Sequence, residues 1–222
     1  MERLSGIFLR EQKTRFLCDV LVEGKETECY IPSSCKLSKL VDLTGKEVLL
    51  QPVESKKART RYSVYAARLG RYYVLLNLAE ANRVVEEQLH RRYFSFLGKR
   101  KPVQREVYVE GYKADLFLPE TKTIIEVKTL LSFEKEGIFP SMKLDRAVKQ
   151  LEIISELLDD GYSVCYMLIS LNPSVKQVAV NIHMKEYYRV FQECQRKGMD
   201  CRAFSVRMKN GQPEISGTIK IR

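Results

Sequence analysis

The sequence has 222 residues, of which 45% are hydrophobic and 30% charged, and its formal net charge is +10. A chain of this size and composition can form one large domain or two modest ones with true apolar cores. It contains no uninterrupted apolar run of membrane-spanning length, and its first residues lack the apolar segment of a signal peptide. We therefore expect a cytoplasmic protein without membrane association.

The positive charge is concentrated in one window. Residues 56–105 contain 13 lysines and arginines against three glutamates, whereas the two signs balance elsewhere. Basic side chains neutralise phosphates, and the aromatic residues that alternate with them can stack on unpaired bases. The window therefore favours nucleic acid as partner, and a solvated basic surface over core aromatics is the alternative. The residues expected to contact nucleic acid here are Lys56, Lys57, Arg59, Arg61, Arg91, Arg92, Lys99, Arg100 and Lys101.

The cysteines never form a C-x-x-C pair, and several of them lie in apolar, strand-like runs. This pattern favours reduced, mostly buried thiols over a zinc site or a disulfide framework. The residues concerned are Cys18, Cys29, Cys35, Cys165, Cys194 and Cys201.

Residues 1–78 have the pattern of short strands separated by turns. Five such strands in a short segment predict a small closed barrel, for which the OB-fold is the natural candidate. Barrels of this kind commonly bind single-stranded nucleic acid, DNA or RNA. The expected strands are Phe16–Val22, Glu26–Ile31, Lys46–Pro52, Arg61–Leu69 and Arg71–Leu76.

From residue 79 the apolar period changes from two to about 3.6, which predicts an amphipathic helix. Ala81 and Val85 lie on its apolar face, and Glu86 and Glu87 lie on the opposite face. We place the boundary between two domains just before this helix, near Leu78, so that residues 1–78 and 79–222 form separate units.

The rest of the chain alternates strands and helices. The continuous apolar run Ser163–Leu171 is typical of a central strand that is covered on both sides. The order of elements predicts an α/β domain with a mixed sheet. Besides a hairpin at residues 112–129 and a loop at residues 137–140, the expected elements are strands Val103–Val109, Ser163–Leu171, Cys201–Met208 and Glu214–Ile219 and helices Met142–Leu158 and Lys185–Arg196.

The hairpin carries the clearest chemical signal. Two β-prone runs, Ala114–Leu118 and Thr123–Val127, flank a four-residue Pro-Glu-Thr-Lys turn. This turn fixes a register in which Asp115 lies directly opposite Glu126. Both carboxylates therefore share one face of the hairpin.

Like charges directly opposite on neighbouring strands are destabilising unless something neutralises them. A divalent cation, Mg²⁺ or Mn²⁺, bound by Asp115 and Glu126 would do so, because Mg²⁺ commonly takes one or two carboxylates and several waters. Lys128 points the same way as Glu126 and could orient a water or stabilise charge on a phosphoryl oxygen. The alternative is an ordinary half-solvated hairpin in which Lys113 or Lys128 offsets the carboxylates.

This order of elements, with a helix Glu, a hairpin Asp, an E-V-K segment and a helix bearing Lys-Gln, resembles the PD-(D/E)XK nuclease core. More narrowly, the whole chain resembles the sugar fermentation stimulation protein A (SfsA) family. The matching residues, in chain order, are Phe16-Leu17, Asp19-Val20, Asn77, Asn82-Arg83, Val85-Glu86-Glu87, Ala114-Asp115-Leu116-Phe117, Glu126-Val127-Lys128, Gly137, Phe139-Pro140, Arg146, Lys149 and Leu151.

The resemblance implies an OB-like domain joined to a PD-(D/E)XK-like domain in a family described as DNA-binding. Asp115 and Glu126 would be metal ligands, and Lys128 the motif lysine. Either Glu86 or Glu87 would be the helix carboxylate, and their helical positions do not distinguish them. Three further residues on the second helix join the expected site, Gln150 in the catalytic group and Arg146 and Lys149 as nucleic-acid contacts.

Two departures from the family pattern stand out. The family's Pro-Asn-Thr-Gly-Ser-Met loop appears here as residues 32–37, without the glycine and its conformational freedom. Gln150 replaces the family's helix histidine, a change that is common in related nucleases.

Two functions follow from these observations. The first is a Mg²⁺-dependent nuclease, an endonuclease or exonuclease, that hydrolyses phosphodiester bonds in DNA. The second is a non-catalytic DNA-binding regulator of sugar-metabolism genes that keeps the nuclease fold.

Overall fold

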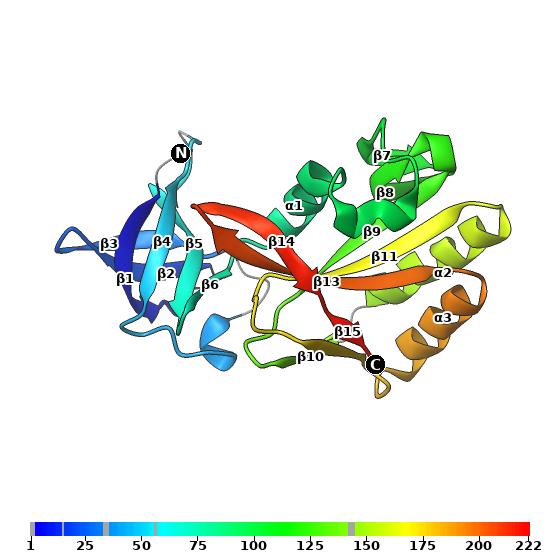
Figure 1. The fold of residues 1–222 in the computed structure, drawn as a ribbon. Coiled ribbons are helices and arrows are strands. Elements are labelled where there is room, and N and C mark those ends of the chain that lie inside the picture. Colours follow the sequence, from blue (N-terminus) through cyan, green and yellow to red (C-terminus); the bar gives the residue numbers. More distant parts are fainter. Residues whose placement is uncertain (1–2, 15, 33–35, 56, 142–144) are drawn as a thin grey trace.

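A computed structural model describes residues 3–14, 16–32, 36–55, 57–141 and 145–222. It has an N-terminal barrel and a C-terminal α/β domain, which lie side by side (Figure 1). Lys56, Cys35, the centre of the 32–37 loop and the start of the helix expected from Met142 lie outside the described residues. In the described part of the chain, no helix combines the length and apolar character needed to span a bilayer.

The barrel confirms the predicted OB-like architecture of five strands. Its strands are ordered β3-β2-β1-β4-β5, and pairing of β3 with β5 closes the ring. Closure removes the unpaired edges that an open sheet would expose. The strands are β1 (Leu4–Glu11), β2 (Leu17–Val22), β3 (Lys25–Tyr30), β4 (Glu47–Pro52) and β5 (Tyr62–Leu69).

The set of strands in the barrel differs from the prediction. The sequence pattern does not predict β1, because Gly6 interrupts its alternation. A Cβ at Gly6 would lie 2.6 Å from Val20 Cγ1 and 2.9 Å from the Leu21 carbonyl, so glycine here permits close contact with β2. Strand β6 (Tyr72–Leu75) pairs with β5 and continues the sheet outside the closed ring.

The α/β domain is built on a six-stranded mixed sheet, as predicted, in the order β14-β13-β11-β9-β8-β7. The central strand β11 is parallel to both β9 and β13, and its residues alternate between two apolar clusters, so it is buried on both faces. Residues of α1 share an apolar cluster with one face, while those of α2 and α3 share a cluster with the other. The elements are α1 (Glu80–Gln88), β7 (Gln104–Val109), β8 (Tyr112–Leu118), β9 (Thr123–Leu130), α2 (Asp145–Asp159), β11 (Ser163–Ser170), α3 (Lys185–Arg196), β13 (Asp200–Lys209) and β14 (Gln212–Thr218), with short 3₁₀ turns at Leu37–Lys39, Arg92–Leu97 and Pro119–Thr121.

A second, three-stranded parallel sheet corrects the prediction of a loop at residues 137–140. Its strands are β10 (Glu136–Phe139), β12 (Gln177–Val180) and β15 (Lys220–Ile221). Each strand is short, and its partners lie far away in the sequence. Local alternation therefore gives too weak a signal to identify them.

The barrel has an apolar cluster of its own, and a second cluster extends across the barrel and the α/β domain. Tyr65 and Leu75 of the barrel belong to the same buried cluster as α1, β11 and β13. The backbone N–H of Leu75 also donates to the carbonyl of Leu171 at 3.1 Å. Because the two parts are packed together in this way, the boundary placed near Leu78 stays a prediction.

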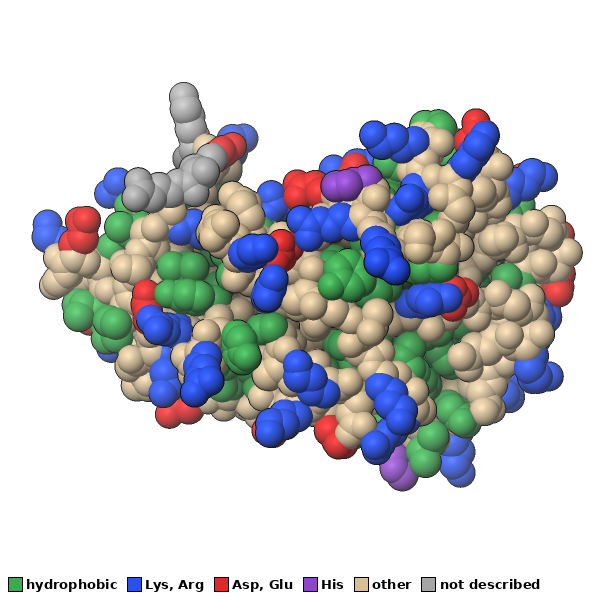
Figure 2. All heavy atoms as spheres, viewed as in Figure 1, with side chains coloured by type: hydrophobic (Ala, Val, Ile, Leu, Met, Phe, Trp, Pro, Cys, Tyr) green, Lys and Arg blue, Asp and Glu red, His purple; other side chains and the backbone are tan. Residues whose placement is uncertain are grey.

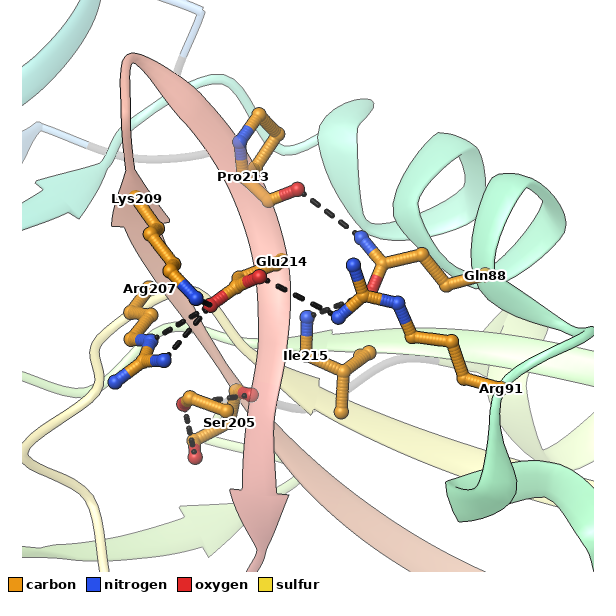
Figure 3. A network of polar contacts seen from close by, with 9 residues as sticks. Gln88, Arg91, Ser205, Arg207, Lys209, Pro213, Glu214 and Ile215 are labelled. Carbon is orange, nitrogen blue, oxygen red and sulfur yellow. Dashed lines mark hydrogen bonds and ion pairs between the residues drawn. The ribbon is translucent and has the colours of Figure 1, made fainter.

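Helix α1 is fastened to the edge strand β14 by a buried side chain. Gln88 Nε2 donates to the Pro213 carbonyl at 3.1 Å, and the Ile215 N–H donates to Gln88 Oε1 at 3.0 Å (Figure 3). A side-chain amide carries both a donor and an acceptor, so it can pair with the edge as a neighbouring strand would. This contact fixes the position of α1 over the sheet.

Replacing Gln88 by alanine should leave a buried N–H and a buried carbonyl of β14 without partners. Each such loss costs about 1–3 kcal/mol, so we expect the free energy of unfolding to fall by about 2–4 kcal/mol in urea titrations. The matched control is Gln192→Ala, which removes an exposed glutamine from α3 and should change stability by less than about 0.5 kcal/mol. Equal losses in the two variants would contradict this account.

Candidate functional site

The candidate site lies where β8 and β9 separate. The two strands pair through Leu118–Thr123, Phe117–Ile124 and Leu116–Ile125, which is the register predicted from the turn. Beyond the last of these pairs, the Asp115 carboxylate replaces a backbone partner of β9. Its Oδ2 accepts a hydrogen bond from the Val127 N–H at 2.8 Å. Asp115 is therefore held against β9 just where the backbone ladder ends.

The second oxygen of Asp115 is held by α1. Asn82 Nδ2 donates to Asp115 Oδ1 at 3.1 Å. Asp115 is thus fixed from the sheet and from the helix at once, while its side chain remains half-buried. Each of its oxygens accepts one of these bonds and keeps a second lone-pair direction free.

Glu126 is the buried carboxylate of the site, with 2% of its surface exposed. Tyr112 donates its hydroxyl to Glu126 Oε2 at 2.6 Å, and Lys128 Nζ donates to Oε1. Burial raises the pKa of Glu126, and the charge of Asp115 raises it further, although Lys128 and Tyr112 act in the opposite direction. The environment therefore favours a proton or an additional cation at this carboxylate.

Lys128 connects this carboxylate to helix α2. Its Nζ also donates to Gln150 Oε1 at 2.9 Å, and it lies 5.9 Å from the centre of the Tyr166 ring. The structure therefore places Glu126, Lys128 and Gln150 in one hydrogen-bonded chain, with Asp115 close enough for its charge to act on Glu126.

The two α1 glutamates have partners outside this chain. Glu86 lies 3.4 Å from Arg105 of β7, and Glu87 lies 3.7 Å from Arg83. Residues four apart share a helical face, so Glu86 lies on the side of Asn82, while the Glu87 side chain is 54% exposed. Among the described contacts, an amide and not a carboxylate joins α1 to Asp115, and the catalytic role of either glutamate stays a prediction.

Glu86 and Glu87 line a cavity of about 610 Å³ together with Lys99, Arg100 and Lys101. Arg100 donates to the Leu89 and Arg91 carbonyls, both at 2.9 Å, so it satisfies backbone acceptors at the end of α1. Lys99 lies 3.3 Å from Glu120. Of these three cations, Lys101 is the exposed one for which the described residues supply no carboxylate partner.

The other predicted nucleic-acid contacts fall into two groups. In the first group, each cation has a partner within the protein. Arg59 makes two hydrogen bonds to Glu28, at 2.7 and 2.9 Å, and Arg91 lies 3.4 Å from Glu214. Arg61 belongs with them, because its guanidinium lies 5.7 Å from the centre of the Tyr62 ring. The second group is exposed and consists of Lys57, Arg92, Arg146 and Lys149.

Sequence reasoning does not single out Tyr112 or Asn82 as site residues. Both contact a carboxylate of the site, at distances of 2.6 Å for Tyr112 and 3.1 Å for Asn82. Asn82 is one helical turn before Glu86, so helical spacing is a signal that could find it. Tyr112 is three positions from Asp115, and strand alternation places two such residues on opposite faces, so it gives no signal for Tyr112.

The residues that could hold a hard cation are the two carboxylates, whose four oxygens each accept one hydrogen bond in this structure. Within the described residues, no three His, Cys, Asp or Glu side chains converge as a metal-binding group. Asp115 and Glu126 nevertheless offer four oxygens, and Mg²⁺ is often held by one or two carboxylates with waters and substrate phosphates. A cation here would also offset the burial and, to a smaller extent, the repulsion from Asp115 that raise the pKa of Glu126.

The fold defines a two-domain protein in which an OB-like barrel is joined to an α/β domain with a mixed sheet. Residues 79–212 match the family model described as the sugar fermentation stimulation protein RE domain, and residues 11–76 match the SfsA N-terminal OB domain. The chain therefore belongs to the SfsA family.

Individual relatives agree with this assignment. The chain is 26% identical over 181 residues to a sugar fermentation stimulation protein homolog of Desulfitobacterium hafniense, covering 80% of this chain and 77% of that one. It is 29% identical over 170 residues to the homolog of Thermosipho melanesiensis, with 76% and 72% covered. The structure of Pyrococcus furiosus SfsA in complex with Ca²⁺ superposes with a TM-score of 0.81 at 16% identity, covering 100% of this chain and 96% of that one.

The raised pKa of Glu126 predicts how the free energy of unfolding depends on pH. The unfolded chain ionises this group near 4.5, while the folded protein retains the proton to higher pH. Its contribution to the free energy of unfolding is therefore fully present below 4.5 and is lost as pH rises through the folded pKa. Glu126→Gln cannot lose this contribution. As pH rises, the free energy of unfolding of wild type should therefore fall relative to that of Glu126→Gln.

Urea titrations of both proteins at stepped pH values measure this difference. Glu134→Gln, which removes an exposed carboxyl outside the site, is the matched control. A difference between wild type and Glu126→Gln that stays constant with pH would show that Glu126 ionises alike in both states.

Proposed function

We propose that the protein is a divalent-cation-dependent DNA phosphodiesterase, with Asp115 and Glu126 as the ligands of Mg²⁺ or Mn²⁺. The observation that carries this proposal is the pair of carboxylates at the split between β8 and β9, with Lys128 Nζ bonded to one of them. A bound cation would lower the pKa of its water and offset charge on the scissile phosphate.

In this proposal, the residues around the carboxylates orient Asp115 and position Lys128. The Val127 N–H and Asn82 hold the two Asp115 oxygens in a fixed orientation. Gln150 and Glu126 hold Lys128 Nζ between α2 and β9. From this position the ammonium would orient the attacking water or stabilise negative charge on a phosphoryl oxygen.

Two further observations support the choice of cation and substrate. The Pyrococcus furiosus relative is described in complex with Ca²⁺, a hard cation that takes oxygen ligands as Mg²⁺ does. Figure 2 shows lysine and arginine side chains over the middle of this face, where the barrel meets the α/β domain. A basic surface of this kind attracts the phosphates of DNA.

The direct test is strand cleavage by the purified protein with Mg²⁺ or Mn²⁺, over single-stranded, duplex and overhang DNA. Asp115→Asn keeps the shape of the side chain but removes its charge. We expect it to reduce the cleavage rate by more than the roughly 10–100-fold typical of residues outside the direct ligands. Glu134→Gln should cleave at the wild-type rate. Equal rates for wild type and Asp115→Asn would refute the assignment.

Cation binding can be measured in the same variants independently of cleavage. Calorimetric titration with Mn²⁺ should show binding to wild type and its loss in Asp115→Asn, with Glu134→Gln as control. Binding without cleavage would identify a metal site that lacks the proposed activity.

A second candidate function is a non-catalytic DNA-binding regulator. Two observations favour it: Lys128 already offsets the charge of Glu126, and the α1 residue that reaches Asp115 is an amide. In this case the site is a structural remnant, and the basic surface alone binds DNA.

The regulator hypothesis makes its own prediction about salt and metal. The logarithm of DNA affinity should fall linearly with the logarithm of salt concentration, with a slope of about −0.9 per phosphate contacted. That affinity should survive both chelation of divalent cations and the Glu126→Gln substitution, as measured by fluorescence anisotropy. Affinity that disappears on chelation would exclude this hypothesis.

A further inference from the structure

A pocket of about 280 Å³ lies at the seam between the two domains. Its walls come from the β5–β6 turn of the barrel and from the end of β13 in the α/β domain, with the loop after β11 closing it. The lining includes three cations and two tyrosines and, among the described residues, no carboxylate. The main lining residues are Arg71, Tyr72, Tyr73, Pro173, Arg207 and Lys209.

The cations around this pocket outnumber the carboxylate beside them. Glu214, whose side chain is 14% exposed, lies 3.4 Å from Arg91, 2.8 Å from Arg207 and 3.8 Å from Lys209 (Figure 3). Burial by itself raises the pKa of Glu214, but the hydrogen bonds from Arg207 and Arg91 leave it below its ordinary value. Arg207 and Lys209 line the pocket and Arg91 does not, so at this wall one negative charge faces two positive ones.

Arg71 adds a further positive charge at the opposite wall. It is exposed at the turn between β5 and β6, and the described residues include no carboxylate partner for it. Three cations face this pocket from two domains, and Glu214 is paired with two of them. The net positive charge that remains suits an anion such as phosphate.

The two tyrosines of the pocket differ in how their side chains are held and exposed. Tyr73 donates its hydroxyl to Glu47 at 2.8 Å, and Arg68 binds the same carboxylate at 3.0 Å, so Tyr73 forms a fixed wall. Tyr72 is 50% exposed, and its ring is available for contact. An exposed aromatic ring beside cations is the arrangement that stacks an unpaired base while its phosphates are neutralised.

The location of the pocket relative to the candidate site suits an extended ligand. Parallel strands β11 and β13 end beside the pocket, and ligands of open α/β sheets bind outside the carboxyl ends of such strands. Glu126 pairs with Tyr166, and Tyr166 pairs with Cys201. Arg207 lies further along β13 than Cys201, about 20 Å along the strand and about 10 Å across from β9. A ligand that contacts both places must bridge this separation of about 22 Å, which a DNA segment of several nucleotides does.

We propose that this seam pocket binds an unpaired segment of DNA, with a base stacked on Tyr72 and phosphates held by Arg71, Arg207 and Lys209. The inference rests on DNA being the ligand in the proposed function, but it requires neither metal nor cleavage. It assigns a place on the molecule where single-stranded DNA is preferred over duplex DNA.

The test measures binding of a labelled oligothymidylate of about 12 nucleotides and of a blunt duplex to the full chain by fluorescence anisotropy. Tyr72→Ala should weaken oligothymidylate binding by roughly 5–150-fold, the effect of losing one base–aromatic stack. It should leave the salt slope unchanged. Tyr72→Phe should retain wild-type affinity, and Tyr108→Ala, which removes a 70% exposed tyrosine from β7, should do so too.

Arg71→Ala should act differently from Tyr72→Ala. It should make the salt slope for single-stranded DNA shallower by about 0.7, the effect of one phosphate contact. Arg196→Ala, which removes an exposed arginine from α3, is its control and should leave the slope unchanged. Circular dichroism checks that each variant is folded.

The outcomes separate this inference from the proposed function. If wild type binds neither DNA probe, both fail. If wild type binds DNA but folded Tyr72→Ala keeps full affinity for oligothymidylate, only the seam pocket is overturned. A Tyr72→Ala loss that is equal for oligothymidylate and blunt duplex would overturn the preference for unpaired DNA.

Discussion

The candidate site depends on one carboxylate that replaces backbone pairing. Where β8 leaves β9, a strand amide loses its partner, and an unpaired buried amide is costly. The Asp115 carboxylate accepts that N–H at 2.8 Å and an α1 amide at 3.1 Å, so one side chain closes the end of a hairpin and joins it to a helix. The same carboxylate therefore stabilises the separation of the two strands beside Glu126.

The position of α1 is therefore part of the site, although its residues are distant in sequence. Gln88 fastens α1 to the edge of β14, and Tyr65 of the barrel donates to Glu80 in its first turn at 2.9 Å. Asn82 lies between these two anchors. The barrel, the helix and the last hairpin thus all contribute to the orientation of Asp115, through the apolar cluster that the two domains share.

What the sequence predicts well is what local rules determine. The hairpin register follows from a short turn, which the structure completes with Lys122 in the left-handed region at a φ of 48°. Helix α3 follows from its apolar period and has the predicted bounds. By contrast, β1 contains a glycine that is explained by contact with β2, and β10 gains its strand pairing from residues 177–180. Tyr112 enters the site through a contact with Glu126 that no local pattern encodes.

The two candidate functions differ in the partner of a single ammonium group. Lys128 Nζ lies between Glu126 and Gln150, so Glu126 has its charge offset within the protein. A divalent cation would compete with Lys128 for the same oxygen, whose burial and proximity to Asp115 favour added positive charge. Gln150 offers a neutral acceptor that would retain the ammonium beside the carboxylates once Glu126 binds a metal ion. An exchange of this kind would leave Lys128 free to act on water or phosphate, whereas without it the network is a closed structural element.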